Sequence, residues 1–213
     1  MVSRPGRRFD ADYGVSTEAL VFLGDLDPEA IGPNIAHATH YEPTPVGDLE
    51  RLLAHVPFEI EDATFVDIGS GMGRAVIAAA LRPFRQVVGV EISPALHAIA
   101  RDNLRGLERP RLRCRDVRLF RRDAASFAFP AGDVVAYLYN PFDETVLRHV
   151  VASLALATPG SRRALLYHTP AARSAIEEDG RFAVIAEEPF GVAYALTDRV
   201  QDHLVRDEQR NAS

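Results

Sequence analysis

The sequence predicts an α/β protein with a doubly wound, mostly parallel seven-stranded sheet and an N-terminal helical segment. Two observations carry this prediction. From residue 63 onward, short apolar runs alternate with amphipathic segments at the spacing of βαβ units. Ahead of residue 63 there is no strand-like run, and the pattern is that of helix and loop. We expect residues 1–45 to form an N-terminal helical or lid segment and residues 46–213 to form the main domain.

The individual elements follow from local patterns. "STEALVFLGDL" predicts a short helix over 16–26, capped by Ser16 or Thr17, and "VGDLERLLAHV" predicts a helix over 46–56. Strands are expected at 63–68, 86–92, 117–124, 133–140, 163–168, 182–188 and 192–200, the last two as a hairpin. Helices are expected at 73–84, 93–107, 143–157 and 170–180, and the second of these has Ser93 as its N-cap.

Composition narrows the class of protein. The chain has 213 residues, of which 47% are hydrophobic, which is enough for a buried core, and its formal net charge is −6, which weakens a nucleic-acid-binding interpretation. The one cysteine, Cys114, excludes an internal disulfide. The N-terminus lacks the apolar region of a signal peptide, and no run approaches the length of a membrane span. We therefore expect a cytoplasmic protein without membrane association.

Polar residues and glycines follow four of the predicted strands directly. They are the glycines of "GSGMG" (69–73), Glu91, Asp123 and Asn140. Ligands of open α/β sheets bind beyond the carboxyl ends of the strands, so one common site explains all four features. A glycine loop before a helix offers close backbone approach and unpaired N–H groups. The dinucleotide spacing G-x-G-x-x-G is not met, because the third glycine comes one residue early.

The stretch "VDIGSGMG" resembles the first motif of class I S-adenosylmethionine-dependent methyltransferases, (D/E)-x-G-x-G-x-G. Asp67, Gly69, Gly71 and Gly73 match it position by position. The resemblance covers about residues 40–200 and implies a Rossmann-like methyltransferase fold with S-adenosylmethionine as cofactor. It also implies that this loop, Ser70 included, meets the methionine part of the cofactor.

Two further strand ends extend this resemblance. Glu91, followed by Ile92, ends the second strand, where an acidic residue can accept hydrogen bonds from both ribose hydroxyls. Asp123 and Ala124 of "RRDAASF" are similar to the acidic and small pair that meets the adenine amino group in this family. Asp123 has an alternative role as a surface partner of Arg121 and Arg122.

The corner "YLYNPFDE" is similar to the (N/D)-P-P-(F/Y) motif of methyltransferases that act on amino nitrogens, although one proline is missing. The resemblance implies that Asn140 and the carbonyl group of Pro141 accept hydrogen bonds from a substrate amine beside the cofactor. Phe142 would wall the site. The alternative is that Asn140 serves only the turn after the strand.

A stiff polar stretch, "HYEPTP" (40–45), precedes the main domain. A similar Tyr-Glu-Pro-Thr stretch occurs ahead of the first motif in small methyltransferases of this type. The resemblance implies that Tyr41, Glu42 and Thr44 face cofactor or substrate as a lid. The alternative is a linker into the next helix.

Other residues have a plain alternative to a functional role. Gly73 can serve packing, and Asp67 can cap the helix. His168 ends the fifth strand and is either a substrate base or a structural residue. His37 and His40 are too few ligands for a metal, so no metal site is expected. Seven arginines between residues 109 and 122 predict an exposed sheet edge, or else a surface for an acidic or nucleic-acid partner.

The expected reaction is transfer of a methyl group in an SN2 step, with an amine nitrogen of a protein or small molecule as acceptor. Three alternatives stay open at this point: methylation of a nucleic-acid base, an NAD-dependent oxidoreductase, and a silent S-adenosylmethionine-binding protein.

Overall fold

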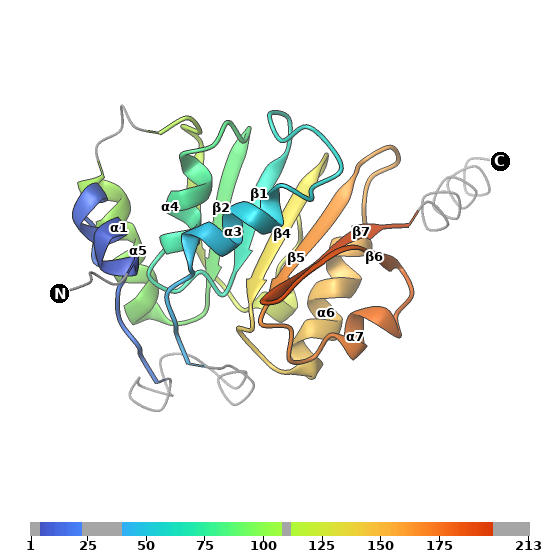
Figure 1. Ribbon diagram of the computed structural model, residues 1–213. Coiled ribbons are helices and arrows are strands. Elements are labelled where there is room, and N and C mark those ends of the chain that lie inside the picture. The colour runs from blue at the N-terminus through green and yellow to red at the C-terminus, as the bar shows by residue number, and fades with distance from the viewer. Residues whose placement is uncertain (1–4, 23–39, 108–111, 198–213) are drawn as a thin grey trace.

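The computed structural model describes residues 5–22, 40–107 and 112–197, which fold around a single seven-stranded sheet (Figure 1). The strand order is β3-β2-β1-β4-β5-β7-β6. The strands are β1 (Thr64–Ile68), β2 (Gln86–Glu91), β3 (Val117–Arg121), β4 (Val134–Tyr139), β5 (Arg163–His168), β6 (Phe182–Glu188) and β7 (Gly191–Leu196). The pairs among β1 to β5 are parallel, whereas β7 is antiparallel to both β5 and β6. The predicted seven-stranded, mostly parallel sheet is confirmed, including the final hairpin.

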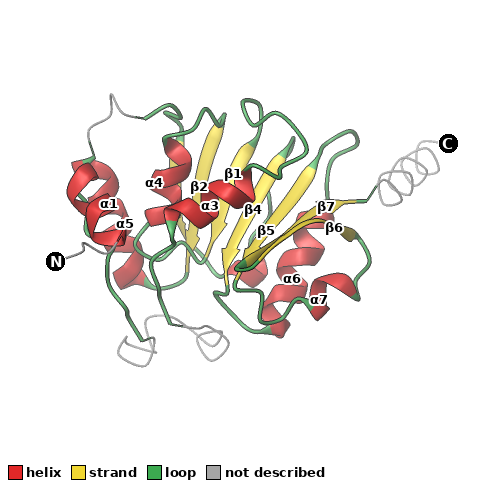
Figure 2. Ribbon diagram, in the orientation of Figure 1, coloured by secondary structure: helices red, strands yellow, loops and turns green. Residues whose placement is uncertain are grey.

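Helices cover both faces of the sheet (Figure 2). Helices α3 (Val46–Leu53), α4 (Arg74–Ala80) and α5 (Pro94–Gly106) lie on one face. Helices α6 (Glu144–Ala155) and α7 (Ser174–Glu177) and the 3-10 turn η4 (Ala124–Ser126) lie on the other. Strands β1 and β4 therefore have buried side chains on both faces, which is why they are continuously apolar in sequence.

The helix starts follow the capping signals of the sequence. Ser93 caps α5, because its Oγ accepts the Leu96 N–H at 3.3 Å, and Pro94 is the first helical residue. Asp143 caps α6 by accepting the Thr145 N–H at 2.9 Å. These caps fix where each chain segment leaves the carboxyl end of its strand.

The helix predicted at 16–26 is wrong over its described part. Residues 15–22 are not helical and contain only one bridge residue, Val21, and residues 23–26 lie outside the described ranges. The N–H groups of Thr17 and Glu18 donate to the Asp10 carboxylate, at 2.7 and 2.8 Å, and are therefore not used to start a helix. The N-terminal helix is instead α1 (Pro5–Tyr13), which begins at a proline and ends before Gly14 with φ of +66°.

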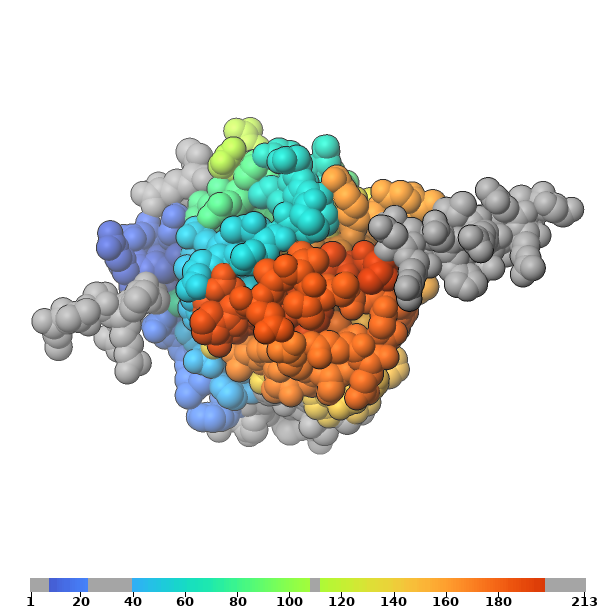
Figure 3. Space-filling model, turned by 45° about the vertical axis from the view of Figure 1, so that its right-hand side comes forward, coloured from blue at the N-terminus to red at the C-terminus, as the bar shows by residue number. Residues whose placement is uncertain are grey.

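The N-terminal segment continues along the edge of the main domain. An isolated antiparallel bridge joins Val21 to Tyr41, with N···O distances of 3.1 and 2.8 Å. In the space-filling view the blue N-terminal residues lie on one side of the cyan surface around α3, and the red β6–β7 hairpin lies directly beside α3 (Figure 3). This bridge to Val21 holds the stretch 40–45 near the carboxyl ends of the strands. None of the helices in the described ranges is both long and apolar enough to cross a bilayer.

Candidate active site

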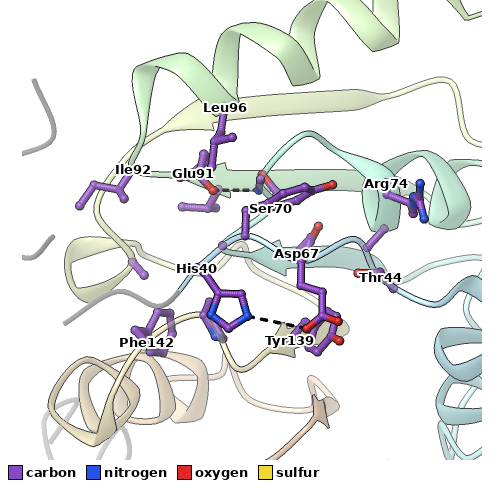
Figure 4. Close-up of a pocket in the computed structure, with 18 of the residues that line it drawn as sticks. His40, Thr44, Asp67, Ser70, Arg74, Glu91, Ile92, Leu96, Tyr139 and Phe142 are labelled. Atoms are coloured by element: carbon purple, nitrogen blue, oxygen red, sulfur yellow. Dashed lines mark hydrogen bonds and ion pairs between the residues drawn. The ribbon is translucent and has the colours of Figure 1, made fainter. Parts of the chain in front are cut away.

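A pocket opens at the carboxyl ends of β1, β2 and β4 and encloses about 840 Å³ of non-atom space, the solvent at its mouth included (Figure 4). Thirteen of the fifteen site residues predicted from the sequence line it. They are Tyr41, Glu42, Thr44, Asp67, Gly69, Ser70, Gly71, Glu91, Ile92, Asp123, Ala124, Pro141 and Phe142. Gly73 and Asn140 are not among its lining residues. Most of the residues predicted from the ends of the strands therefore lie in one pocket.

The glycine loop after β1 is shaped by close contacts. Gly69 and Gly71 have φ of +82° and +52°, the left-handed region that favours glycine. A Cβ at Gly69 would overlap the Pro141 side chain, and a Cβ at Gly71 would overlap the Tyr41 ring. A Cβ at Gly73 would meet Ala100 of α5 at 3.2 Å, so the geometry of Gly73 favours its packing alternative.

Replacing Gly71 by alanine is expected to reduce affinity for S-adenosylhomocysteine, the demethylated form of the cofactor that the sequence resemblance implies, by at least about tenfold. Backbone strain adds roughly 1–3 kcal/mol of destabilisation. The reason is that the new Cβ would displace the Tyr41 ring from the loop. The measurement is calorimetric titration together with thermal unfolding.

Gly132→Ala is the matched control for this prediction. Gly132 also has a positive φ, +81°, but a Cβ there would have only Arg85 nearby, at 3.9 Å. The control should lose stability and keep its affinity. Equal affinities in both variants would contradict the role given to the contact between Gly71 and Tyr41.

Glu91 closes the glycine loop from the neighbouring strand. Its carboxylate accepts the Gly71 N–H at Oε2 and the Ser93 N–H at Oε1, both at 2.8 Å. One of the dashed lines in Figure 4 marks the first of these bonds. Burial raises the pKa of Glu91, and the backbone hydrogen bonds oppose that rise. A buried acceptor that still lines the pocket can take further hydrogen bonds from a ligand's hydroxyl groups.

Asp67, near the carboxyl end of the apolar strand β1, has a buried carboxyl group. Its exposed fraction is 4%, and no hydrogen bond or ion pair reaches it from the residues that the structure describes. Burial, with a smaller effect from the charge of Glu91, raises the pKa of Asp67 to about 8. No side chain caps α4, so the capping alternative for Asp67 does not hold. A costly unpartnered carboxyl group in a pocket points to a cationic ligand.

The pocket lining around Asp123 and its neighbour Arg122 is otherwise apolar. Asp123 accepts the Ala125 N–H at 2.9 Å and so caps η4, with Ala124 next to it. Ile92 and Leu96 line the same region. Apolar side chains beside a residue that can form hydrogen bonds suit a heteroaromatic base.

The corner after β4 has a strained backbone. Asn140 has φ of +39°, and its Oδ1 accepts a hydrogen bond from the Tyr167 hydroxyl at 3.3 Å. This bond holds the Asn140 side chain toward β5. The same corner presents Pro141 and Phe142 to the pocket, with Phe142 only 6% exposed.

The stretch 40–45 lies over the glycine loop. The Tyr41 hydroxyl donates to the Thr17 carbonyl oxygen at 2.8 Å, while its ring covers Gly71. Glu42 is half exposed and lies 3.8 Å from the His40 Nε2. Burial and the nearby Glu42 carboxylate raise the pKa of Tyr139. The side chains of Glu42 and Tyr139 therefore lie close to one another in the pocket lining.

His168 lies outside the pocket lining. It is 3% exposed, its Nε2 lies 3.2 Å from the Asp48 carboxylate, and its Nδ1 lies 3.0 Å from the Thr169 hydroxyl. Burial lowers the pKa of His168. This geometry favours the structural alternative over a substrate base.

The remaining predictions concern metals and the arginine-rich stretch. His37 lies outside the described residues, and within these residues no three potential metal ligands come together. Arg118, Arg121 and Arg122 are exposed on or just after β3, an edge strand of the sheet. Arg122 also lines the pocket.

Eight further lining residues were not predicted from the sequence: His40, Arg74, Ala75, Val90, Leu96, Arg122, Tyr139 and Val146. Tyr139 could have been found, because it is the last residue of the strand that leads into the Asn140 corner. Arg74 follows the glycine loop directly, yet its burial depends on residues more than fifty positions away.

Comparison with known proteins agrees with this geometry. Residues 65–156 match a family model described as a methyltransferase domain. An RNA methyltransferase from Salinibacter ruber, in complex with S-adenosylhomocysteine, is 24% identical over 73% of this chain and 92% of its own, with a TM-score of 0.51. The glycopeptide N-methyltransferase MtfA, complexed with S-adenosylmethionine, is 16% identical over 73% and 88%, with a TM-score of 0.53. At these identities the two structures show a shared fold, and no curated protein matches the chain.

The sheet order, the pocket on the glycine loop and the matched domain together define a cofactor-dependent transferase. Residues 65–156 are a methyltransferase domain, and this match together with the shared fold supports the predicted class I S-adenosylmethionine-dependent methyltransferase. The predicted enzyme class and the predicted cofactor are confirmed, and the oxidoreductase alternative no longer stands.

Proposed function

We propose that the enzyme methylates an amine nitrogen carried by a protein or a small molecule. The observation that carries this proposal is the contact between the Asn140-Pro141-Phe142 corner and the glycine loop. Pro141 lies against Gly69 so closely that no Cβ would fit between them, and both residues line the pocket. An acceptor held at this corner would lie beside the methionine end of the cofactor.

The charges and shape of the pocket suit S-adenosylmethionine. Asp67 would pair with the ammonium group of the methionine part, which explains an otherwise unpartnered buried carboxyl group. Glu91 would accept the ribose hydroxyls, and Asp123 with Ala124 would meet the adenine edge. When bound, the cofactor supplies a methyl group on a positively charged sulfur.

The contribution of the chain to the reaction is alignment and exclusion of water. Pro141 and Phe142 wall the acceptor end, and Phe142 is held by its own burial in the core. Alignment of donor and acceptor accounts for much of the barrier reduction in reactions of this kind. Glu42 and Tyr139 give this end of the pocket oxygen atoms that can attract an amine, which is mostly protonated in water.

Methylation of a nucleic-acid base is the second candidate. The exposed arginines at β3 favour it, since one of them, Arg122, also lines the pocket. The Salinibacter ruber protein of similar fold is an RNA methyltransferase, whereas MtfA is a glycopeptide N-methyltransferase. The net charge of −6 and the corner at Asn140 favour the amine acceptor.

The acceptor class can be tested with methyl-labelled S-adenosylmethionine and a cell extract separated into protein, nucleic-acid and small-molecule fractions. We expect label in the protein or small-molecule fraction, located on a nitrogen by mass spectrometry. Label in nucleic acid alone would replace the proposal with the second candidate. Cofactor binding without transfer to any fraction would indicate a silent binding protein.

Asn140→Ala is expected to keep affinity for S-adenosylhomocysteine within about twofold and to lower the turnover number by about a hundredfold or more, as expected when an interaction that aligns the acceptor is lost. Tyr167→Phe removes the hydroxyl that holds Asn140 and leaves the amide in place. Steady-state kinetics should show a smaller loss in this second variant. An equal loss in both variants would mean that Asn140 acts only by shaping the corner, and a large loss of affinity in Asn140→Ala would contradict its assignment to the acceptor.

A further inference from the structure

A buried arginine joins the glycine loop to the N-terminal segment. Arg74, the first residue of α4, is 3% exposed. Its Nε donates to the Thr17 hydroxyl at 2.6 Å, and its Nη2 lies 3.1 Å from the Asp10 carboxylate and 2.8 Å from the Glu18 carboxylate. Its guanidinium group also lies over the Phe9 ring. Two acidic partners and a hydroxyl group thus offset the cost of removing the Arg74 guanidinium group from water.

The N-terminal segment is ordered around the same network. The Asp10 carboxylate accepts the N–H groups of Thr17 and Glu18 and, at 2.5 Å, the Thr17 hydroxyl. Burial opposes ionisation of Asp10, but these hydrogen bonds and the charge of Arg74 outweigh it and lower the pKa of Asp10. Asn103 of α5 donates to the carbonyl oxygens of both Ser16 and Met72, each at 3.0 Å. Residues 10–18 are therefore fixed to the glycine loop and to both helices beside it.

The network reaches the pocket through Thr17. The side chain of Thr17 binds Arg74, while its carbonyl oxygen accepts the hydroxyl group of Tyr41. The bridge between Val21 and Tyr41 holds the same residue from its backbone. The Tyr41 ring, so held, covers Gly71 and lines the pocket.

We infer that Arg74 is a positioning residue for cofactor binding, and that the N-terminal segment is part of the cofactor site. Arg74 acts through Thr17, which fixes Tyr41 over the glycine loop. Affinity for S-adenosylmethionine then depends on residues 10–21, although only Arg74 and Tyr41 of this network reach the pocket. The inference concerns cofactor binding alone and does not depend on which acceptor the enzyme uses.

The test is calorimetric titration of the full chain with S-adenosylhomocysteine, accompanied by thermal unfolding of each variant. Arg74→Met and Thr17→Val are each expected to lower affinity by on the order of tenfold, the scale of one hydrogen bond to a charged group. Thr17→Ser keeps the hydroxyl group, so this variant is expected to bind with wild-type affinity. Tyr41→Phe keeps the ring and removes only its bond to Thr17.

A double-variant cycle separates positioning from general stabilisation. If Arg74 acts through Tyr41, the variant that combines Arg74→Met with Tyr41→Phe should bind no more weakly than Arg74→Met alone. Arg163→Met is the matched control, because Arg163 is also a buried arginine but donates to the carbonyl oxygens of Gly132 and Pro130, outside the pocket. The control should unfold at a lower temperature and keep its affinity.

Two results would overturn the inference. One is a lower unfolding temperature with unchanged affinity in Arg74→Met, which would make Arg74 a structural residue like Arg163. The other is unchanged affinity in both Thr17→Val and Tyr41→Phe, and these mild substitutions settle the question even if Arg74→Met does not fold.

Discussion

Replacing Glu91 by glutamine is expected to weaken binding of S-adenosylmethionine by on the order of a hundredfold, the equivalent of about 3 kcal/mol. The carboxylate already accepts two backbone N–H groups in a buried position, and the ribose hydroxyls would add two more donors. A glutamine side chain has one acceptor oxygen, and its amide group would face the N–H of Gly71 or Ser93. One buried donor is thereby left without a partner.

Calorimetric titration with S-adenosylhomocysteine measures this loss without turnover. Glu188→Gln is the matched control, since Glu188 pairs with Arg51 and His55 and does not line the pocket. The control should bind like the wild type. If the affinity of the Glu91→Gln variant is within twofold of the wild-type affinity, Glu91 does not bind the cofactor.

Replacing Asp67 by asparagine is expected to have two effects of opposite sign. Cofactor affinity should fall by about tenfold to a hundredfold, because the carboxylate is the partner proposed for the ammonium group. The cofactor-free protein should become more stable at pH 8. The trade-off arises because a group placed for a charged ligand is costly to the fold while that ligand is absent.

The pH dependence follows from the direction of the pKa shift of Asp67. Its pKa is raised from 3.8 to about 8 in the folded chain, so between these values the folded state holds a proton that the unfolded state has released. Stability therefore falls with rising pH, by about 1.4 kcal/mol per unit, until the loss is complete above the folded pKa. Asparagine has no such slope. The variant should unfold at least about 5 °C above the wild type at pH 8, with a smaller difference at pH 5.

Asp133→Asn is the control with the opposite sign. Asp133 pairs with Arg162, and despite its burial these contacts lower the pKa of Asp133. Its stabilisation is present above the ordinary aspartate pKa and is lost only in stronger acid, so this variant should be less stable at both pH values. Thermal unfolding of the cofactor-free proteins makes the comparison. If the Asp67→Asn variant is less stable than the wild type at pH 8, Asp67 is not an unpartnered carboxyl group with a raised pKa.

Much of the sheet could be predicted because its central strands are buried on both faces. A strand such as β1 is then a continuous apolar run, and the alternation with helical segments fixes the parallel order. The same rule placed the glycine loop, Glu91 and Asp123 at one edge. The resemblance of the glycine loop to the methyltransferase motif then predicted which cofactor binds there.

What could not be predicted depends on contacts between distant residues. The segment around Thr17 has a helical pattern, but hydrogen bonds with Asp10, Arg74 and Asn103 hold it in a non-helical conformation. Asn140 has the expected position after β4, but the Tyr167 hydroxyl turns its side chain toward β5. Neither local propensity nor motif spacing contains this information, because in each case the partner comes from another element of the fold.

Calorimetric titration of the wild-type chain and the Glu91→Gln variant with S-adenosylmethionine, S-adenosylhomocysteine and NAD would show directly whether the glycine loop and Glu91 hold the cofactor. We expect micromolar binding of the first two ligands to the wild type, a large loss of affinity in the variant, and no binding of NAD. Binding of NAD alone, or binding of S-adenosylmethionine that the Glu91→Gln substitution leaves unchanged, would contradict the placement of the cofactor on the glycine loop.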